Sequence, residues 1–262
     1  MQFDIDWQRA SDLHVCAYAT FLHYFRNFSA SSIKSAFSGI SHFYKMLMLT
    51  NPIRSPAIDK LLITYSREQQ QDNRRPINRQ VLRRLLLLHH PDLPCYYDDA
   101  FYLIYTLMYR MALRISEITN YSEKFHHALR YSDIVLHHGI ASLQVTLRSY
   151  KHSTEKKIFQ LQLSNTSIAV LTRFLQARGD TDGQLFIHRN GKLFSRSFIA
   201  KTLRDDLYKL GYNPMDYNTH SFRIGRTTDL AEAGCSELQI AQLGRWTSKA
   251  YHKYIRATHI SA

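Results

Sequence analysis

Three short runs of β-branched or alternating residues interrupt a chain whose other apolar positions follow a helical period. The runs cover residues 133–136, 140–148 and 157–163, and the segments 137–139 and 151–155 supply turns between them. Such short connections favour antiparallel pairing of neighbouring strands. The sequence therefore predicts a mainly α fold with a small three-stranded antiparallel β-sheet, an α+β protein.

Helical spacing of apolar residues predicts the remaining elements. Ser31-Ser32 and Asn78 are expected to cap two of the helices, and Ser236 with Gln239 fits a capping box at a third. We expect helices over residues 11–25, 33–49, 57–69, 80–88, 97–112, 167–178, 195–210, 221–233, 237–243 and 250–256.

A polar, basic segment divides the chain. Residues 70–75 read Gln-Gln-Asp-Asn-Arg-Arg and have no apolar periodicity, which is typical of a linker. A chain of 262 residues is long enough for two cores. We therefore expect a helical domain over residues 1–75 and a second domain over residues 76–262.

The chain is strongly basic, with 34 Lys and Arg against 21 Asp and Glu and a formal net charge of +13. Such an excess indicates a polyanionic partner, either nucleic acid or an anionic membrane surface. No window approaches the roughly 20 apolar residues of a membrane span, and Met1–Asp6 lacks the basic start and apolar run of a signal peptide. Nucleic acid is thus the favoured partner.

Cysteine and histidine usage points away from disulfides and metals. Cys16, Cys95 and Cys235 are far apart and odd in number, which fits a reducing intracellular compartment. The adjacent histidine pairs have side chains that diverge, so they are poor chelates and we expect them in solvent or in turns. These pairs are His89-His90, His126-His127 and His137-His138. We expect no metal and no cofactor.

Cutting a DNA phosphodiester without a metal needs fixed positive charge on the phosphate oxygens, a nucleophile and a proton donor. Arginine suits the first role because its planar fork binds phosphate oxygens and stays charged. Arg114 follows an apolar helix, and Glu117 lies three residues later on the same helical face. An ordinary surface ion pair is the alternative interpretation of this segment.

Two later segments carry the same kinds of side chain. In His220-Ser221-Phe222-Arg223, the His and Arg share one face near a helix start, where a phosphate is also favoured. The segment 243–256 combines an indole, Tyr251 and Tyr254 on one face, and several basic residues. The alternatives are a surface helix start for the first segment and a basic helix with core aromatics for the second.

Taken together and in this order, the three segments resemble the tyrosine recombinase family, which includes Cre, the Xer recombinases and lambda integrase. The resemblance covers roughly residues 76–256, while residues 1–75 resemble the family's helical core-binding domain in pattern. It implies that Arg114 and Arg223 grip the scissile phosphate, that Glu117 supports Arg114, and that His220 manages the proton of the nucleophile. Tyr-Ile-Arg at the end implies Tyr254 as that nucleophile.

Three further expectations come with the resemblance. The family places a Lys on a turn between strands, which implies Lys151 as the acid for the leaving oxygen, with Lys156 and Lys157 as alternatives. Leu243-Gly244-Arg245-Trp246 is similar to the segment that carries the family's His-or-Trp position. Arg245 stands where many relatives have His, with Trp246 beside it, so the choice of phosphate contact between these two side chains stays open. The wording Arg-Trp-Thr-Ser also resembles eukaryotic mobile elements of crypton type.

The resemblance implies a site-specific DNA recombinase or integrase that forms a 3′-phosphotyrosyl intermediate without metal or ATP. Its partner would be double-stranded DNA, on which four protomers assemble over paired sites, in the nucleus or the nucleoid according to the host. No phosphate-binding GxxxxGK[ST] motif occurs, which is consistent with this expectation. The alternatives are a type IB topoisomerase-like enzyme and a domesticated, inactive DNA-binding module.

Overall fold

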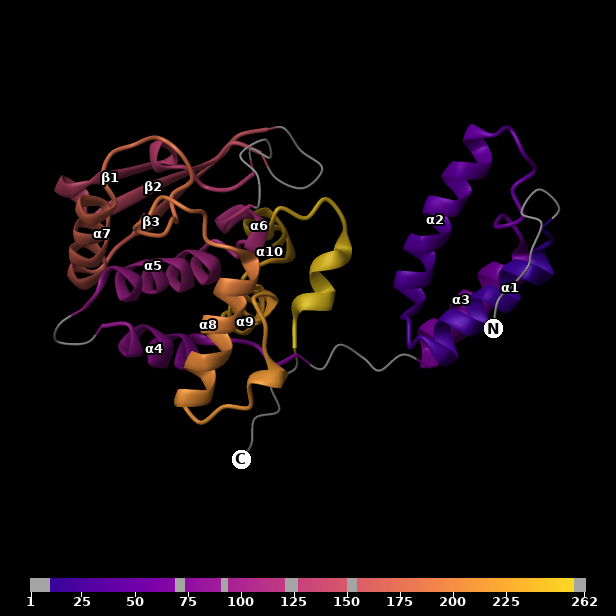
Figure 1. Cartoon of the computed structure of the whole chain (residues 1–262). Coiled ribbons are helices and arrows are strands. Elements are labelled where there is room, and N and C mark those ends of the chain that lie inside the picture. The colour runs from indigo at the N-terminus through magenta and orange to yellow at the C-terminus, as the bar shows by residue number, and fades with distance from the viewer. Residues whose placement is uncertain (1–9, 69–73, 91–93, 121–126, 150–154, 257–262) are drawn as a thin grey trace, which may run out of the picture. The chain divides into compact units, whose positions relative to one another are not determined.

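The computed structural model describes residues 10–68, 74–90, 94–120, 127–149 and 155–256. The chain divides into two units, residues 1–73 and 74–262, drawn in Figure 1. Within the described residues, no helix combines the length and the apolar character needed to cross a membrane.

The N-terminal unit is a small helical assembly. Helix α1 (Asp12–Thr20) continues into a π-helical turn, η2 (Phe21–Phe25), and is followed by α2 (Ala30–Met46) and α3 (Pro56–Glu68). The sequence predicts one regular helix over 11–25, but its last turn is widened. Ser29 caps α2 by accepting a hydrogen bond from the Ser32 amide at 3.0 Å, so the expected cap at Ser31-Ser32 was wrong. The core of this unit consists of Val15, Ala19, Leu22, Ala30, Ile33, Phe37, Ile58, Leu62 and Tyr65.

The second unit is built around α5 (Tyr96–Arg110), whose side chains are almost all buried. Helix α4 (Arg79–Leu88) is capped by Asn78, as the sequence predicts, since Asn78 Oδ1 accepts from the Val81 amide at 3.0 Å. The other helices are α6 (Ile115–Ile118), α7 (Asn165–Arg178), α8 (Arg196–Lys209), α9 (His220–Glu232) and α10 (Glu237–Gly244). Short 3₁₀ turns complete the unit at η3 (Tyr131–Asp133), η4 (His138–Ile140), η5 (Pro214–Asp216) and η6 (Lys249–Tyr254).

The expected antiparallel sheet is confirmed. Its strands are β1 (Ile134–His137), β2 (Ser142–Leu147) and β3 (Lys157–Gln162), in the order β1-β2-β3. Val145 is paired with Ile134 on one side and Phe159 on the other. Leu143, Val145 and Leu147 point inward and join one core with α5 and α7, and Figure 1 shows these helices beside the sheet. The fold is therefore mainly α with a small sheet, as the sequence predicts.

Two tight backbone features position the elements that follow. Ala112 has a left-handed φ of +46°, and the Leu113 amide donates to the Met108 carbonyl at 3.0 Å, which turns the chain sharply out of α5. A Cβ on Gly225 would lie 1.8 Å from the Ile77 carbonyl oxygen. Helix α9 thus lies against the backbone that leads into α4.

One expectation for the histidines was wrong. His89 is not a solvated turn residue: its side chain is buried and bonds to Asp206 at 2.7 Å and to Asp98 at 3.2 Å. Tyr105 donates to the same Asp206 carboxylate at 2.7 Å. The buried Asp206 carboxylate needs these donors because an isolated charge in the core would be costly. The cluster joins α4, α5 and α8.

Candidate active site

Arg114 stands at the start of α6, directly after the left-handed turn at Ala112. Its amide donates to one Glu117 carboxylate oxygen at 2.7 Å, and its guanidinium donates to the other at 3.3 Å. The Arg114 side chain keeps 19% of its surface exposed, whereas Glu117 keeps only 2%. Glu117 therefore fixes Arg114 from the inside while part of the guanidinium stays open to solvent.

Arg245 contacts the same carboxylate from a distant part of the chain. It ends α10 in a left-handed conformation with a φ of +58°, and its side chain is fully buried. Its Nη2 donates to Glu117 at 2.7 Å, and its Nη1 donates to the Met111 and Leu243 carbonyls at 3.1 Å. The guanidinium of Arg245 thus lies inside the protein and ties α10 to the α5–α6 turn.

Arg223 lies in the first turns of α9 and is 1% exposed. Its two terminal nitrogens donate to the Ala112 carbonyl at 2.6 Å and to the Gly244 carbonyl. Arg245 donates to the same Ala112 carbonyl at 3.3 Å. Burial, followed by the positive charges of Arg114 and Arg245, lowers the pKa of Arg223 to about 9. Three guanidiniums thus lie around a single carboxylate, and the cluster carries excess positive charge.

Aromatic rings cover Arg223. The Trp246 ring centroid lies 4.0 Å from its guanidinium carbon, and the Tyr254 ring centroid lies 5.3 Å from it. The Trp246 and Tyr254 centroids are 5.0 Å apart, and the His220 ring is stacked at 6.3 Å from Tyr254. A Cβ on Gly244 would lie 1.7 Å from the Trp246 ring, so a glycine is needed for the indole to fold back over this turn.

The two tyrosines of the C-terminal segment have different surroundings. Tyr254 belongs to the cluster with Arg223, and its carbonyl accepts from the Thr228 hydroxyl of α9 at 3.3 Å. Tyr251 is buried, and its hydroxyl donates to Glu237 at 2.5 Å. That hydrogen bond, with burial and the nearby negative charge, raises the pKa of Tyr251 to about 12. Figure 1 shows the segment η6 that carries both residues in yellow.

Two of the three candidate lysines, Lys156 and Lys157, lie at the start of β3. Lys151 lies outside the described residues. Lys156 is exposed, whereas the Lys157 ammonium donates to the Gln242 carbonyl near the end of α10. Burial, and then the charge of Arg245, lowers the pKa of Lys157. Lys157 thus holds α10 beside the arginine cluster.

The structure brings together seven of the residues singled out from the sequence, Tyr254 included. Arg114, Glu117, His220, Arg223, Arg245 and Trp246 all contact one another or Tyr254 within one cluster, directly or through a shared partner. Sequence reasoning missed Ala112, whose carbonyl holds two arginines, and Glu237, which holds Tyr251. A left-handed alanine has no sequence signal, and Glu237 was recognised only as part of a helix start.

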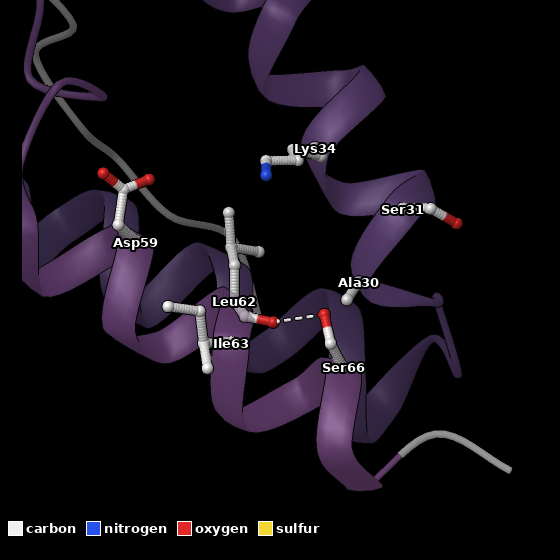
Figure 2. Close-up of a pocket in the computed structure, with 7 residues that line it drawn as sticks. All are labelled: Ala30, Ser31, Lys34, Asp59, Leu62, Ile63 and Ser66. Atoms are coloured by element: carbon white, nitrogen blue, oxygen red, sulfur yellow. Dashed lines mark hydrogen bonds between the residues drawn. The ribbon is translucent and has the colours of Figure 1, made fainter. Parts of the chain in front are cut away.

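A separate cavity lies in the N-terminal unit. It has a volume of about 480 Å³ between α2 and α3, and Figure 2 shows Lys34 and Asp59 at its edges above Leu62 and Ile63. The Ser66 hydroxyl donates to the Leu62 carbonyl at 2.7 Å, inside the helix. No buried charged group points into this groove, so it has none of the chemistry of the arginine cluster. Among the described residues, no group of three or more His, Cys, Asp or Glu side chains is arranged to hold a metal.

Comparisons with known proteins show the family of the chain. The family model described as "Phage integrase family" matches residues 76–259, so the chain belongs to the phage integrase family, the tyrosine recombinases. A search of curated proteins gave no match.

Solved structures of similar fold include three recombinases. The XerA recombinase is 20% identical over 98% of this chain and 82% of its own, with a TM-score of 0.55. The XerH site-specific recombinase bound to difH substrate is 12% identical over 97% of this chain and 69% of its own, with a TM-score of 0.65. The Tn1549 transposon integrase in complex with circular intermediate DNA is 14% identical over 96% and 83%, with a TM-score of 0.62. At these identities the likeness concerns the fold.

Proposed function

We propose that this chain is a site-specific recombinase or integrase that cleaves and rejoins duplex DNA through Tyr254. The observation that carries the proposal is the convergence of Arg114, Arg223 and Tyr254 from three distant segments, together with His220 and Trp246. The single carboxylate of Glu117 is paired with Arg114 and Arg245, while Arg223 donates to the Ala112 and Gly244 carbonyls. The three guanidiniums thus exceed the negative charge beside them, which favours an anion at this point.

Duplex DNA is the anion that fits the whole chain. The net charge of +13 supplies the long-range attraction that nucleic-acid binding requires. XerH and the Tn1549 integrase, which share this fold, were solved with DNA. Residues 1–75 would form the second half of a DNA clamp, as the helical pattern of the family implies.

The proposed chemistry is one transesterification. The Tyr254 hydroxyl gives its proton to His220, and its oxygen attacks the phosphorus while Arg114 and Arg223 hold the non-bridging oxygens. The bond to the 5′ oxygen breaks, and Lys151 protonates that oxygen. The products are a 3′-phosphotyrosyl bond and a free 5′ hydroxyl. A free tyrosine has a pKa near 10 and only about one in a thousand is ionised at pH 7, so the attack needs the proton transfer to His220.

The proposed transesterification needs no energy source. One phosphodiester is exchanged for another, and the reverse attack by a 5′ hydroxyl rejoins the strand. Four protomers would act on two paired DNA sites. In this proposal arginines, rather than a metal ion, provide the positive charge beside the phosphate oxygens. Cleavage should therefore continue in the presence of EDTA.

The test is a nicked suicide duplex, which traps the covalent intermediate because the 5′ end diffuses away. Duplexes carrying candidate terminal sequences are incubated with the protein and resolved on a denaturing gel. We expect an adduct that Tyr254→Phe abolishes while DNA binding persists. Binding with no adduct from the unaltered protein would favour an inactive DNA-binding module, and relaxation of a single supercoiled circle without strand exchange would favour a topoisomerase.

A further inference from the structure

The segment that carries Tyr254 has little backbone structure of its own. Helix η6 spans only six residues, from Lys249 to Tyr254, and Ser248 begins it with a long bond of 3.4 Å to the Ala250 amide. A 3₁₀ helix has weaker hydrogen-bond geometry than an α-helix and rarely persists alone. The direction of the Tyr254 side chain must therefore be set by contacts with neighbouring elements.

Tyr251 forms a side-chain hydrogen bond from η6 to α10. Its ring is 4% exposed, and its hydroxyl donates to the Glu237 carboxylate at 2.5 Å. Glu237 is the first residue of α10. Hydrogen bonds to an ionised acceptor are roughly twice as strong as neutral ones. Since the pKa of Tyr251 is raised to about 12, the phenol stays protonated and keeps donating throughout the neutral range.

Helix α10 is itself held at both ends. At its start, the Ser236 amide donates to the Gln239 side chain at 2.8 Å, and the Gln239 amide donates back to the Ser236 hydroxyl at 3.3 Å. At its end, the Gly244 carbonyl accepts from Arg223, and Arg245 donates to Glu117. The helix that receives Tyr251 is therefore part of the framework that fixes the arginines.

The geometry of a 3₁₀ helix connects the two tyrosines. It has three residues per turn, so side chains at positions i and i+3 lie above one another. Tyr251 and Tyr254 are spaced in this way, and Trp246 contacts both, with ring centroids 6.3 Å and 5.0 Å away. Holding the Tyr251 ring therefore sets the rotation of the turn that presents Tyr254.

We propose that Glu237 and Tyr251 form a positioning pair that orients Tyr254 toward Arg223. The pair ties the nucleophile segment to the same helix that ends at the arginine cluster, so that the attacking oxygen and the phosphate-holding charges keep one relative geometry. Neither residue has a phosphate contact in the proposed reaction. The proposal rests on the proposed function only for its effect on cleavage, because the orientation of η6 can be measured without DNA.

The first measurement is amide hydrogen exchange in residues 249–256 of the full chain. Tyr251→Phe removes only the hydroxyl, and Glu237→Ala removes the acceptor; each should speed exchange in this segment by about tenfold. Glu237→Gln retains an acceptor oxygen and should fall between these variants and the unaltered protein. Tyr105→Phe is the control, since it deletes a different tyrosine–carboxylate hydrogen bond, the buried one to Asp206, whereas Glu237 is an exposed residue. It should leave exchange in residues 249–256 unchanged.

The second measurement is the single-turnover rate of adduct formation on the nicked duplex. Tyr251→Phe and Glu237→Ala should slow it by roughly ten- to a hundredfold with unchanged DNA affinity, because small misplacements of a reacting group are costly. The double variant should be no slower than either single variant, and Glu237→Gln should recover part of the rate. If Tyr251→Phe and Glu237→Ala showed the same exchange and cleavage rates as Tyr105→Phe, the proposed positioning role of the pair would be wrong. An absence of adduct from the unaltered protein would count against the proposed function, and the exchange data would still decide the pair.

Discussion

The guanidinium carbon of Arg223 lies 4.0 Å from the centre of the Trp246 indole, and the terminal nitrogens of Arg223 bond to the Ala112 and Gly244 carbonyls. The Arg223 guanidinium is thus held at its nitrogens by two backbone carbonyls, and its face is covered by an aromatic ring. Such a contact stabilises a charge that burial otherwise penalises. The Trp246 indole also lies beside the Tyr254 ring. In the proposed reaction it would line the phosphate pocket.

Trp246 should therefore have two separable effects. Trp246→Phe keeps a ring over Arg223 and removes the indole N–H, so cleavage should fall by roughly tenfold while the melting temperature changes little. Trp246→Ala also removes the cation–π contact, worth about 0.5–2 kcal/mol, and should lower the melting temperature as well. Thermal melts and single-turnover cleavage measure the two effects. A phenylalanine variant with the full cleavage rate would show that the N–H makes no phosphate contact.

Arg245 and Arg114 should behave differently although both bond to Glu117. Arg245→Ala removes a fully buried partner and should cost about 3–5 kcal/mol, or roughly 10 °C in melting temperature. Arg114 is partly exposed, and Arg114→Ala leaves Arg245 on Glu117, so we expect a loss of cleavage with a stability change within about 1 kcal/mol. Chemical denaturation compares the two variants. Equal losses of stability would contradict the division of roles.

The positive cluster should bind small oxyanions. Burial, and then repulsion from Arg114 and Arg245, lowers the pKa of Arg223 to about 9, and a bound dianion relieves that repulsion. Sulfate should therefore raise the melting temperature more than chloride does at equal ionic strength. Arg223→Gln is the control and should lose most of this difference.

The same pKa fixes the direction of the pH effect. The folded pKa of Arg223 lies below the unfolded value of 12.5, so above about pH 9 the unfolded state binds more protons and this group makes the apo protein more stable as pH rises. Sulfate binding needs the charged form, so its stabilising effect should shrink over the same range. Melting scans from pH 7 to about 10.5 with and without sulfate test this. A sulfate effect that grows above pH 9 would refute the assignment to Arg223.

Gly225 should be needed for the contact between α9 and the start of α4. A Cβ there would meet the Ile77 carbonyl oxygen at 1.8 Å, and overpacking of this kind costs about 1–3 kcal/mol. Gly225→Ala should thus lower stability and displace Arg223. Gly39 in α2 is the opposite case, because a Cβ there meets nothing within 4 Å. Gly39→Ala should be neutral or stabilise by up to about 1 kcal/mol. Urea unfolding of both variants measures the difference.

Local sequence patterns were enough to predict most of the helices and strands of the fold. The period-2 runs of the three strands, the apolar stripe of α5 and the cap at Asn78 each depend on residues within one turn or hairpin, and these expectations match the structure. The three motif segments were also visible without coordinates, because their residue types and order are contained in the sequence. The family membership follows from the same segments.

What only the tertiary structure decided is which side chains are buried and which partners they meet. The sequence left open whether Arg245 or Trp246 contacts a phosphate; in the structure Arg245 is fully buried and paired with Glu117, 128 residues away. The structure likewise separates Tyr251, which is bonded to Glu237, from Tyr254, which lies beside Arg223. The physical reason is the same in both cases. Local sequence sets backbone conformation through short-range sterics and hydrogen bonds, whereas the exposure and charge environment of a side chain depend on residues that only the folded chain brings near.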